Sequence, residues 1–362
     1  MKARLGDYIQ EYSVRNRAEE DIPVYSVTNA QGFCQDYFGK EVASKDKSTY
    51  KIVPKGCFAY NPSRINVGSV DWQRHEDRVI VSPLYNVFSV APQLDQQYLY
   101  YYLKSDFALQ RIKTVATGSV RDNLKLAMLY EFPINLPSTE SQKDIVKKLD
   151  GAKRVVSLRE QELQILEDLI KARFVEMFGD PVRNEKKWQT KALEDVCKSI
   201  VDCPHSTPSY TSEDTGFMCI RTSIVKKNRI KWEDIEYIPE EEYIQRIQRK
   251  KPEKGDVVYT REGAILGIAA VIDRDCNVAL GQRSMLLSPD RAFCTPEFIS
   301  VAMNFDSFLD NALKGMSGSA SPHINVGDIK AFKMILPPIA QQEEFTTFVV
   351  QVDKSKFVAH YY

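Results

Sequence analysis

The sequence predicts a mixed protein of the α+β or α/β kind, made of two similar domains that are joined by long helices. Three observations lead to this prediction: a stretch with a seven-residue apolar repeat, an internal repeat of the sequence, and strand and helix patterns in the same order in both halves. We expect domains at 1–137 and 181–337, a central helix at 138–180 and a short helix at 338–362. Related helices of a pseudo-twofold repeat run in opposite directions, so we expect them to form an antiparallel coiled coil.

The central helix is predicted by apolar residues that recur every seven positions, at Leu149, Val156, Leu163, Ile170 and Met177. Most positions between them are charged or polar, as in an amphipathic helix. Ser138 or Thr139 can cap the first turn, and Gly179 followed by Pro181 ends the helix. About 40 residues give a rod of about 60 Å. We expect Leu149, Val156, Leu163 and Ile170 to be buried against the second helix, each contributing about 1.5 to 3 kcal/mol. The alternative is a long surface helix packed on one domain.

An internal repeat at an offset of 200 residues relates the two halves. Residues 117–119 (Thr-Gly-Ser) match 317–319 (Ser-Gly-Ser), and the Leu-Pro segment at 134–137 matches the one at 334–337. Gln142, at the start of the central helix, corresponds to Gln342. The chain is therefore expected to follow the order domain, helix, domain, helix.

Each domain has strand and helix signals in the same order. Runs of β-branched and aromatic residues bounded by Gly, Pro, Asn and Ser predict strands in the first domain at 22–28, 57–60 and 79–90. The corresponding strands of the second domain are expected near 217–225, 256–260, 267–272 and 283–288. A helix is expected at 98–112 in the first domain and at 296–313 in the second, where Pro296 suits a first turn.

Composition indicates an ordinary globular chain of 362 residues with zero net charge, 43% hydrophobic and 27% charged residues. No run of 18 apolar residues exists, and the first ten residues lack the apolar segment of a signal peptide. The seven cysteines form no C-x-x-C pair and are interpreted as free thiols. We therefore expect a cytoplasmic protein, and any claim of nucleic-acid binding must rest on local residues.

Polar loops at matching positions of the two domains offer the chemistry of base and phosphate contact. Asn and Arg can pair with the edges of adenine and guanine, aromatic rings can stack, and Lys can neutralise phosphates. The candidate DNA-binding residues of the first domain are Tyr60, Asn61, Arg64, Asn66, Arg121 and Asn123. Those of the second domain are Lys227, Lys250, Thr260, Arg261, Gln282, Arg283, Ser319, His323 and Asn325. The alternative for each is an ordinary turn or a solvated charge; the repetition favours the functional interpretation.

We expect these residues to have different roles. Substituting Arg64 or Asn66 should alter the bases read by the first domain, and substituting Arg261 or Gln282 those read by the second. Substituting Lys227 or Lys250 should weaken binding to all sequences, because phosphate contacts carry no base information. No Walker loop, dinucleotide-binding fingerprint, adenine-methyltransferase tetrapeptide or metal-ligand spacing occurs in the sequence. No catalytic or metal-binding residues are therefore predicted.

The sequence resembles the specificity subunit of a type I restriction-modification system. Three segments carry the resemblance over almost the whole chain: 172–181 (Ala-Arg-Phe-Val-Glu-Met-Phe-Gly-Asp-Pro), 336–343 (Leu-Pro-Pro-Ile-Ala-Gln-Gln-Glu) and 61–68 (Asn-Pro-Ser-Arg-Ile-Asn-Val-Gly). The resemblance implies two target recognition domains, each reading half of a bipartite site in double-stranded DNA. It also implies that the helix pair docks two modification (adenine methyltransferase) subunits and that restriction subunits join the complex.

The resemblance further implies that this chain is not an enzyme and holds no cofactor. S-adenosylmethionine would be bound by the modification subunits, and ATP and Mg²⁺ by partner subunits. Only 24 residues follow Pro338, so we expect the coil to be incomplete and part of the apolar stripe of the first helix to be exposed. A modification subunit, rather than a second copy of the chain, is expected to cover it. The alternatives to this function are a self-contained DNA nuclease or methyltransferase and a coiled-coil scaffold.

Overall fold

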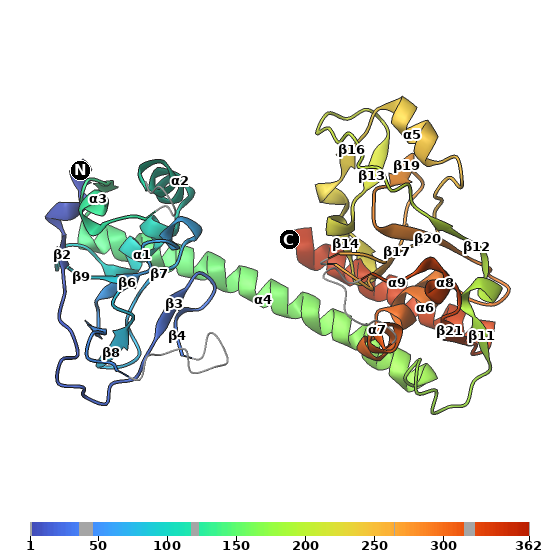
Figure 1. Cartoon of the computed structure of the whole chain (residues 1–362), viewed down its shortest axis with the longest axis horizontal. Coiled ribbons are helices and arrows are strands. Elements are labelled where there is room, and N and C mark those ends of the chain that lie inside the picture. Colours follow the sequence, from blue (N-terminus) through green and yellow to red (C-terminus); the bar gives the residue numbers. More distant parts are fainter. Residues whose placement is uncertain (1, 36–45, 117–122, 264, 315–322, 362) are drawn as a thin grey trace. The chain divides into compact units, whose positions relative to one another are not determined.

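The structure is a computed structural model that describes residues 2–35, 46–116, 123–263, 265–314 and 323–361. The chain divides into two compact units, Met1–Ser157 and Leu158–Tyr362 (Figure 1). The division falls inside the long helix α4, Thr139–Phe178, so the first turns of α4 belong to unit 1 and the last turns to unit 2. The domain limits expected from the sequence remain a prediction.

Unit 1 is built on an antiparallel four-stranded sheet in the order β2-β9-β6-β7. Two further pairs, β3-β4 and β5-β8, accompany it, and β1 pairs with β10. The strands of unit 1 are β1 (Lys2–Arg4), β2 (Ile9–Glu11), β3 (Ser26–Thr28), β4 (Gly32–Cys34), β5 (Lys51–Pro54), β6 (Phe58–Tyr60), β7 (Val70–Trp72), β8 (Arg78–Val81), β9 (Asn86–Val90) and β10 (Pro133–Asn135). Its helices are η1 (Leu5–Asp7), η2 (Ile65–Val67), α1 (Gln96–Lys104), α2 (Asp106–Val115), α3 (Leu126–Tyr130) and the first part of α4.

Unit 2 repeats this arrangement with the antiparallel sheet β12-β20-β17-β18 and the pair β11-β21. A three-stranded sheet, β16-β13-β19, and the hairpin β14-β15 complete it. Its strands are β11 (Thr190–Ala192), β12 (Cys197–Asp202), β13 (Met218–Ile220), β14 (Val225–Lys226), β15 (Arg229–Ile230), β16 (Glu236–Tyr237), β17 (Val257–Thr260), β18 (Ala269–Val271), β19 (Val278–Leu280), β20 (Ser284–Pro289) and β21 (Lys333–Ile335). Its helices are η3 (Leu193–Val196), η4 (Thr222–Ile224), η5 (Trp232–Asp234), α5 (Glu240–Arg246), α6 (Pro296–Met303), α7 (Asp306–Leu313), α8 (Val326–Lys330), α9 (Ile339–Tyr361) and the last part of α4.

The predicted repeat is therefore confirmed as a repeat of mixed α and β structure. Two predicted helices are each divided into two. Ser105 ends α1 and starts α2, because its backbone is extended and its hydroxyl accepts a hydrogen bond from the Ala108 N–H. Likewise, 296–313 forms α6 and α7 with a break at Asn304 and Phe305. The predicted strand at 79–90 is also two strands, β8 and β9, since the segment between them contains Pro83 and forms a turn.

A buried glutamine fixes the start of each long helix. The Gln142 side chain is completely buried; it accepts a hydrogen bond from the Asp95 N–H at 2.8 Å and donates to the Gln93 and Pro137 carbonyls. Gln342 makes the corresponding bonds to Thr295, Phe293 and Pro337. Gln142 and Gln342 match in the sequence because each makes the same hydrogen bonds, which join a long helix to the segment before α1 or α6.

Helices α4 and α9 pair antiparallel in unit 2, as expected. The Phe345 ring in the second turn of α9 lies 5.4 Å from Phe174 and 5.6 Å from Phe178 near the end of α4, and Arg173 pairs with Glu344 at 2.8 Å. Figure 1 shows α9 running back along α4 from this point. The ends of α4 are also as predicted, because Ser138 Oγ accepts a hydrogen bond from the Ser141 N–H and Gly179 has a φ of +79°.

The predicted burial of the seven-residue stripe is correct only at the end of α4. Ile170 is buried and Leu163 is half-buried, but Leu149 is 40% exposed and Val156 is 58% exposed. α9 packs against the end of α4 in unit 2, where Ile170 belongs to the core cluster, whereas Leu149 and Val156 belong to none of the core clusters of the described residues. The expected exposure of part of the stripe is therefore confirmed. Among the described residues, no helix combines the length and apolar character needed to cross a membrane.

Candidate nucleic-acid interface

The two polar loops that the sequence singled out in each domain lie together in each unit. In unit 1 the Leu124 N–H donates to the Pro62 carbonyl at 3.1 Å, which joins the turn after β6 to the segment before α3. In unit 2 the Ile324 N–H donates to the Arg261 carbonyl at 2.8 Å, joining the turn after β17 to the segment before α8. The same backbone contact thus builds one polar surface per unit.

The turn of unit 1 is shaped by Asn61. Its side-chain oxygen accepts hydrogen bonds from the N–H and the hydroxyl of Ser63, at 3.1 and 2.9 Å, which holds the backbone in a tight turn leading into η2. Gly68 closes the turn with a φ of +87°, a conformation that glycine adopts readily. As a result Arg64 is exposed, and its guanidinium has no partner among the described residues. Asn66 is half-buried on the same turn.

Beside this turn is an open pocket of about 350 Å³ that the sequence did not reveal. Asn61 and Arg64 line one side, and residues of β3 and of the turn between β8 and β9 line the rest. The polar side chains that the sequence analysis missed here are Tyr25, Ser26, Thr28, Asn29, Tyr50, Ser82 and Tyr85. Burial raises the pKa of Tyr25, so its hydroxyl stays protonated and can donate a hydrogen bond. The β3 segment carried only a strand pattern, and no sequence signal placed it beside Arg64.

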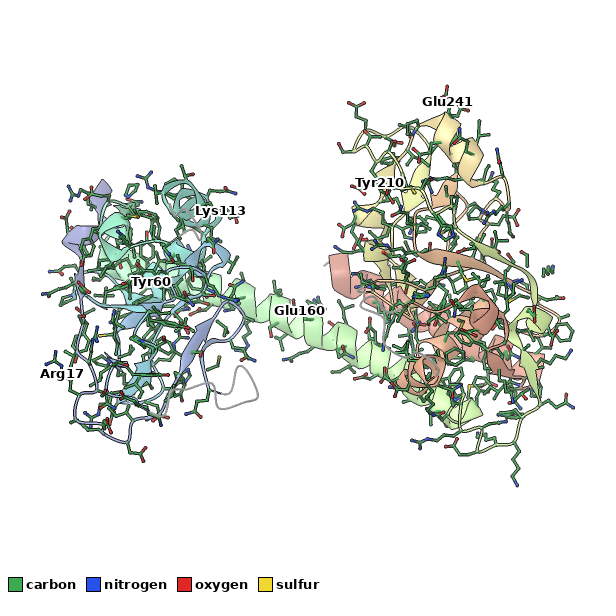
Figure 2. All side chains as sticks on the ribbon, in the orientation of Figure 1. Arg17, Tyr60, Lys113, Glu160, Tyr210 and Glu241 are labelled. Carbon is green, nitrogen blue, oxygen red and sulfur yellow. The ribbon has the colours of Figure 1, made fainter. Side chains whose placement is uncertain are left out.

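Tyr60 and Thr260 are wrongly predicted as contact residues. Both are completely buried in the central sheets. The Tyr60 hydroxyl donates to the Leu124 carbonyl at 3.1 Å, and Figure 2 shows this side chain inside unit 1. Thr260 Oγ1 accepts a hydrogen bond from the Ile268 N–H at 2.9 Å. A ring in the core cannot stack on a base, and both residues belong to strands in which every residue is buried.

Arg261 is held by a carboxylate, so its predicted contact with a base edge stays a prediction. Its side chain is 9% exposed, and its Nε and Nη2 donate to the two carboxylate oxygens of Asp202 at 3.0 and 3.2 Å. These two bonds occupy the Nε side of the guanidinium and leave the N–H groups of Nη1 and the second N–H of Nη2 without a partner in Asp202. Arg261 therefore fixes β12 against the turn after β17.

Arg283 is an exposed cation beside this turn of unit 2 and has a φ of +67°. Its Nη1 would lie 3.4 Å from a Cβ placed on Gly263, so the arginine extends across that glycine. Gln282 is predicted to contact a base. In the structure its Nε2 donates hydrogen bonds to the His205 carbonyl and the Thr207 hydroxyl, both at 2.8 Å. Gln282 thereby holds the exposed loop that follows β12 next to Arg283.

Three predicted residues lie on the segments before α3 and α8. Asn123, His323 and Asn325 are all exposed. His323 forms a backbone bridge with Glu262, which places it on the turn beside Arg261. Asn325 Nδ2 donates to Asp328 at 3.1 Å. Arg121 and Ser319 lie outside the described residues.

The two predicted phosphate contacts already have anionic partners. Lys227 Nζ lies 3.0 Å from Asp306, and this ammonium is the main reason that the pKa of Asp306 is lowered. Lys250 Nζ lies 2.9 Å from the largely buried Asp256. An exposed pair of the first kind contributes about 0 to 1 kcal/mol and can exchange partners, so a phosphate role for Lys227 remains a prediction. The residues that the structure describes contain no group of three or more metal-ligating side chains.

Comparison with known proteins gives one family and several distant relatives. The family model for the type I restriction modification DNA specificity domain matches the chain twice, at residues 7–168 and 185–358. The type I restriction enzyme MjaVIII specificity subunit of Methanocaldococcus jannaschii is 22% identical over 274 residues, which are 72% of this chain and 64% of that protein. The EcoKI specificity subunit of Escherichia coli strain K12 is 24% identical over 278 residues, which are 70% of this chain and 58% of that protein.

A solved structure has a similar fold. The type I restriction-modification S subunit from M. genitalium aligns over 99% of this chain and 91% of its own, with a TM-score of 0.55 and 14% identity. The chain spans less than two thirds of the length of the two curated relatives above.

Proposed function

Since this chain belongs to the family of type I restriction-modification DNA specificity domains, we propose that it reads a bipartite DNA target, with one half-site for each unit. Unit 1 would read its half through the turn bearing Asn61, Arg64 and Asn66, and unit 2 through Arg283 and His323. The chain would act as a specificity subunit without chemistry of its own.

The observation that carries this proposal is the repeated polar surface. Both units place an exposed arginine beside a turn that is hydrogen-bonded to the segment before a short helix, α3 or α8. Arginine is the side chain that most often specifies guanine, and exposed amides can pair with adenine. The two surfaces differ in sequence on the same framework, which suits two different half-sites.

The proposal extends to partners and cofactors. Modification subunits would dock on the helices and supply S-adenosylmethionine and the transfer of the methyl group to adenine. Restriction subunits would supply ATP-driven cleavage with Mg²⁺. The exposed stripe of α4, which includes Leu149 and Val156, supports docking, because apolar surface of this kind is normally covered in an assembly.

Methylation mapping tests the proposal. The chain is expressed with its modification subunit, and modified adenines are mapped across the host genome. The expected result is a single two-part target with an unspecified spacer. The purified chain is then incubated with duplex DNA, S-adenosylmethionine and Mg²⁺. Methyl transfer or cleavage by the chain alone would contradict the absence of chemistry, and a complex whose DNA affinity is independent of sequence would indicate a scaffold.

A further inference from the structure

Three cations of unit 1 gather around one aromatic ring. Above the ring of Tyr100 lie Lys104 Nζ at 5.6 Å, Lys153 Nζ at 5.7 Å and the guanidinium carbon of Arg74 at 5.8 Å. Arg74 also covers the Trp72 ring at 4.5 Å. We call Arg74, Tyr100, Lys104 and Lys153 the Tyr100 cluster. Its members come from the segment after β7, from α1 and from α4.

The positive charge of the Tyr100 cluster is only partly neutralised by the protein. Arg74 pairs with the buried Asp71. Lys104 Nζ donates to the carbonyl and the side-chain oxygen of Asn29, at 3.0 and 2.9 Å, and these are neutral groups. Lys153 is exposed and has no carboxylate partner among the described residues. The acidic residue one turn earlier on α4, Asp150, accepts a hydrogen bond from Tyr101 instead. Burial lowers the pKa of Lys104; the Asp71 carboxylate raises this pKa and the Lys153 ammonium lowers it, both with smaller effects than burial.

The fold does not need charged side chains at the positions of Tyr100 and Lys104, because unit 2 has hydrogen-bonded neutral side chains at the matching positions. Ser300 occupies the place of Tyr100 in α6, Asn304 the place of Lys104, and Asn228 in the β14-β15 turn the place of Asn29. There the Ser300 hydroxyl donates to Asn228 Oδ1 at 3.1 Å, and Asn304 Nδ2 donates to the same oxygen at 2.7 Å. Both Ser300 and Asn304 are buried. A neutral network therefore suffices for packing, and the cations of unit 1 are available for a ligand.

The position of the Tyr100 cluster indicates the ligand. Lys104 Cδ lies 3.5 Å from a Cβ placed on Gly68, at the end of the turn that bears Arg64 and Asn66. Asn29, which Lys104 holds, also lines the pocket beside Arg64. Burial raises the pKa of Tyr100, so its hydroxyl remains a hydrogen-bond donor to an anion. Clustered donors and cations next to a base-reading turn suit consecutive phosphates of one DNA strand.

We propose that Arg74, Lys104 and Lys153 bind the phosphate backbone of DNA beside the bases read by the turn of unit 1. This inference rests on the proposed function and adds to it a group of backbone-contact residues in unit 1. The matching region of unit 2 has Lys171 and Lys227 beside Asn228 and Asn304, and both lysines pair with Asp306. Phosphate contacts fix the register of the protein on the duplex without specifying bases.

The test measures the salt dependence of DNA affinity with the complete complex of this chain and its modification subunits. Fluorescence anisotropy is recorded on a duplex with the mapped target and on one without it, over a fourfold range of salt concentration. The variants are Lys153→Gln, Arg74→Gln and the double variant, and the matched control is Lys148→Gln, an exposed lysine of α4 outside the cluster. Lys104 is left unchanged because it also holds Asn29.

Each single variant should bind both duplexes more weakly and reduce the slope of log K against log salt by about 0.9, so that its loss of affinity over the salt range is about 3.5-fold smaller than for the unchanged protein. The double variant should reduce the slope by about 1.8, which makes the loss about 12-fold smaller. The methylated sequence should stay the same for every variant, and the thermal unfolding curve should stay the same for Lys153→Gln. Arg74→Gln should lower the unfolding temperature, because it removes the cation from the buried Asp71, so Lys153→Gln is the deciding variant. All values should stay the same for Lys148→Gln. Unchanged slopes would overturn the inference. Loss of the modification subunit at an unchanged slope would also overturn it and would assign the cluster to a protein partner. If the unchanged complex showed no target preference, the proposed function itself would fail.

Discussion

At the residue scale, exposure separates the predicted contacts into two groups. The sequence placed Arg64 and Arg261 in matching loops, but the first is exposed and the second is held by Asp202. Residue type and loop position cannot distinguish these cases, because the carboxylate partner lies 59 positions away in the chain. Arg283, which was among the predicted residues, takes the exposed position in unit 2.

The first prediction concerns these exposed arginines. Arg64→Ala should relax recognition in one half-site, and Arg283→Ala in the other, each costing about 1 to 3 kcal/mol if the guanidinium pairs with a base edge. Methylation mapping of each variant complex shows which half changes. A single variant that altered both halves would contradict the assignment of one half-site to each unit.

The second prediction concerns Arg261. Arg261→Ala should destabilise unit 2 by about 3 kcal/mol, because Asp202 would keep only its contact with the exposed His205. Arg283→Ala serves as the control, because it also removes an arginine of unit 2 but one that is exposed, and it should change stability little. Urea denaturation of the two variants makes the comparison. Equal stability of Arg261→Ala and the unchanged chain would show that the pair with Asp202 is not structural.

At the scale of elements, the sequence predicts what local chemistry decides. The limits of α4 follow from the cap at Ser138 and the left-handed Gly179, and both were visible in the sequence. The division of 98–112 into two helices was missed, since serine is tolerated inside a helix and only the tertiary fold shows that Ser105 acts as a cap. Short edge strands such as β1 and β11 were missed because three residues carry too little periodicity.

The third prediction concerns the buried glutamines that start α4 and α9. Gln142→Ala or Gln342→Ala should destabilise its own unit by about 2 to 4 kcal/mol, because a buried N–H and two carbonyls lose their partner. Lys143→Ala and Glu343→Ala, at the adjacent exposed positions, are the controls. Thermal unfolding followed by circular dichroism measures the effect, and a loss no larger than that of the controls would be evidence against the role of the glutamines.

At the scale of the whole molecule, the two repeats differ in how their helices are covered. Phe345 and Val349 of α9 are buried, and Phe174 and Ile170 belong to the same core cluster. The matching residues of α4, Ile145 and Leu149, are 37% and 40% exposed. The sequence predicted an uncovered part of the stripe, but it could not show which end would be free, because that depends on the register of the helix pair.

The fourth prediction concerns this uncovered stripe. Leu149→Glu and Val156→Glu should weaken assembly with the modification subunit, since each places a charge on an apolar docking surface, and should leave the fold of the chain intact. Gln161→Glu, at an exposed polar position of α4, is the control. Light scattering over a concentration series measures assembly. A stable dimer of the isolated chain that Leu149→Glu converts to a monomer would instead assign the stripe to a second copy.

In each unit the first strand in the sequence pairs with the last one, and this has a practical consequence. Lys2 lies opposite Asn135 in β1 and β10, and Thr190 lies opposite Ile335 in β11 and β21. Each repeat therefore enters and leaves at neighbouring points, as do domains that tolerate insertion into a host protein. A graft of unit 2 into an unrelated carrier would have to include the end of α4 and the start of α9, because Phe174, Phe178 and Phe345 fill its core.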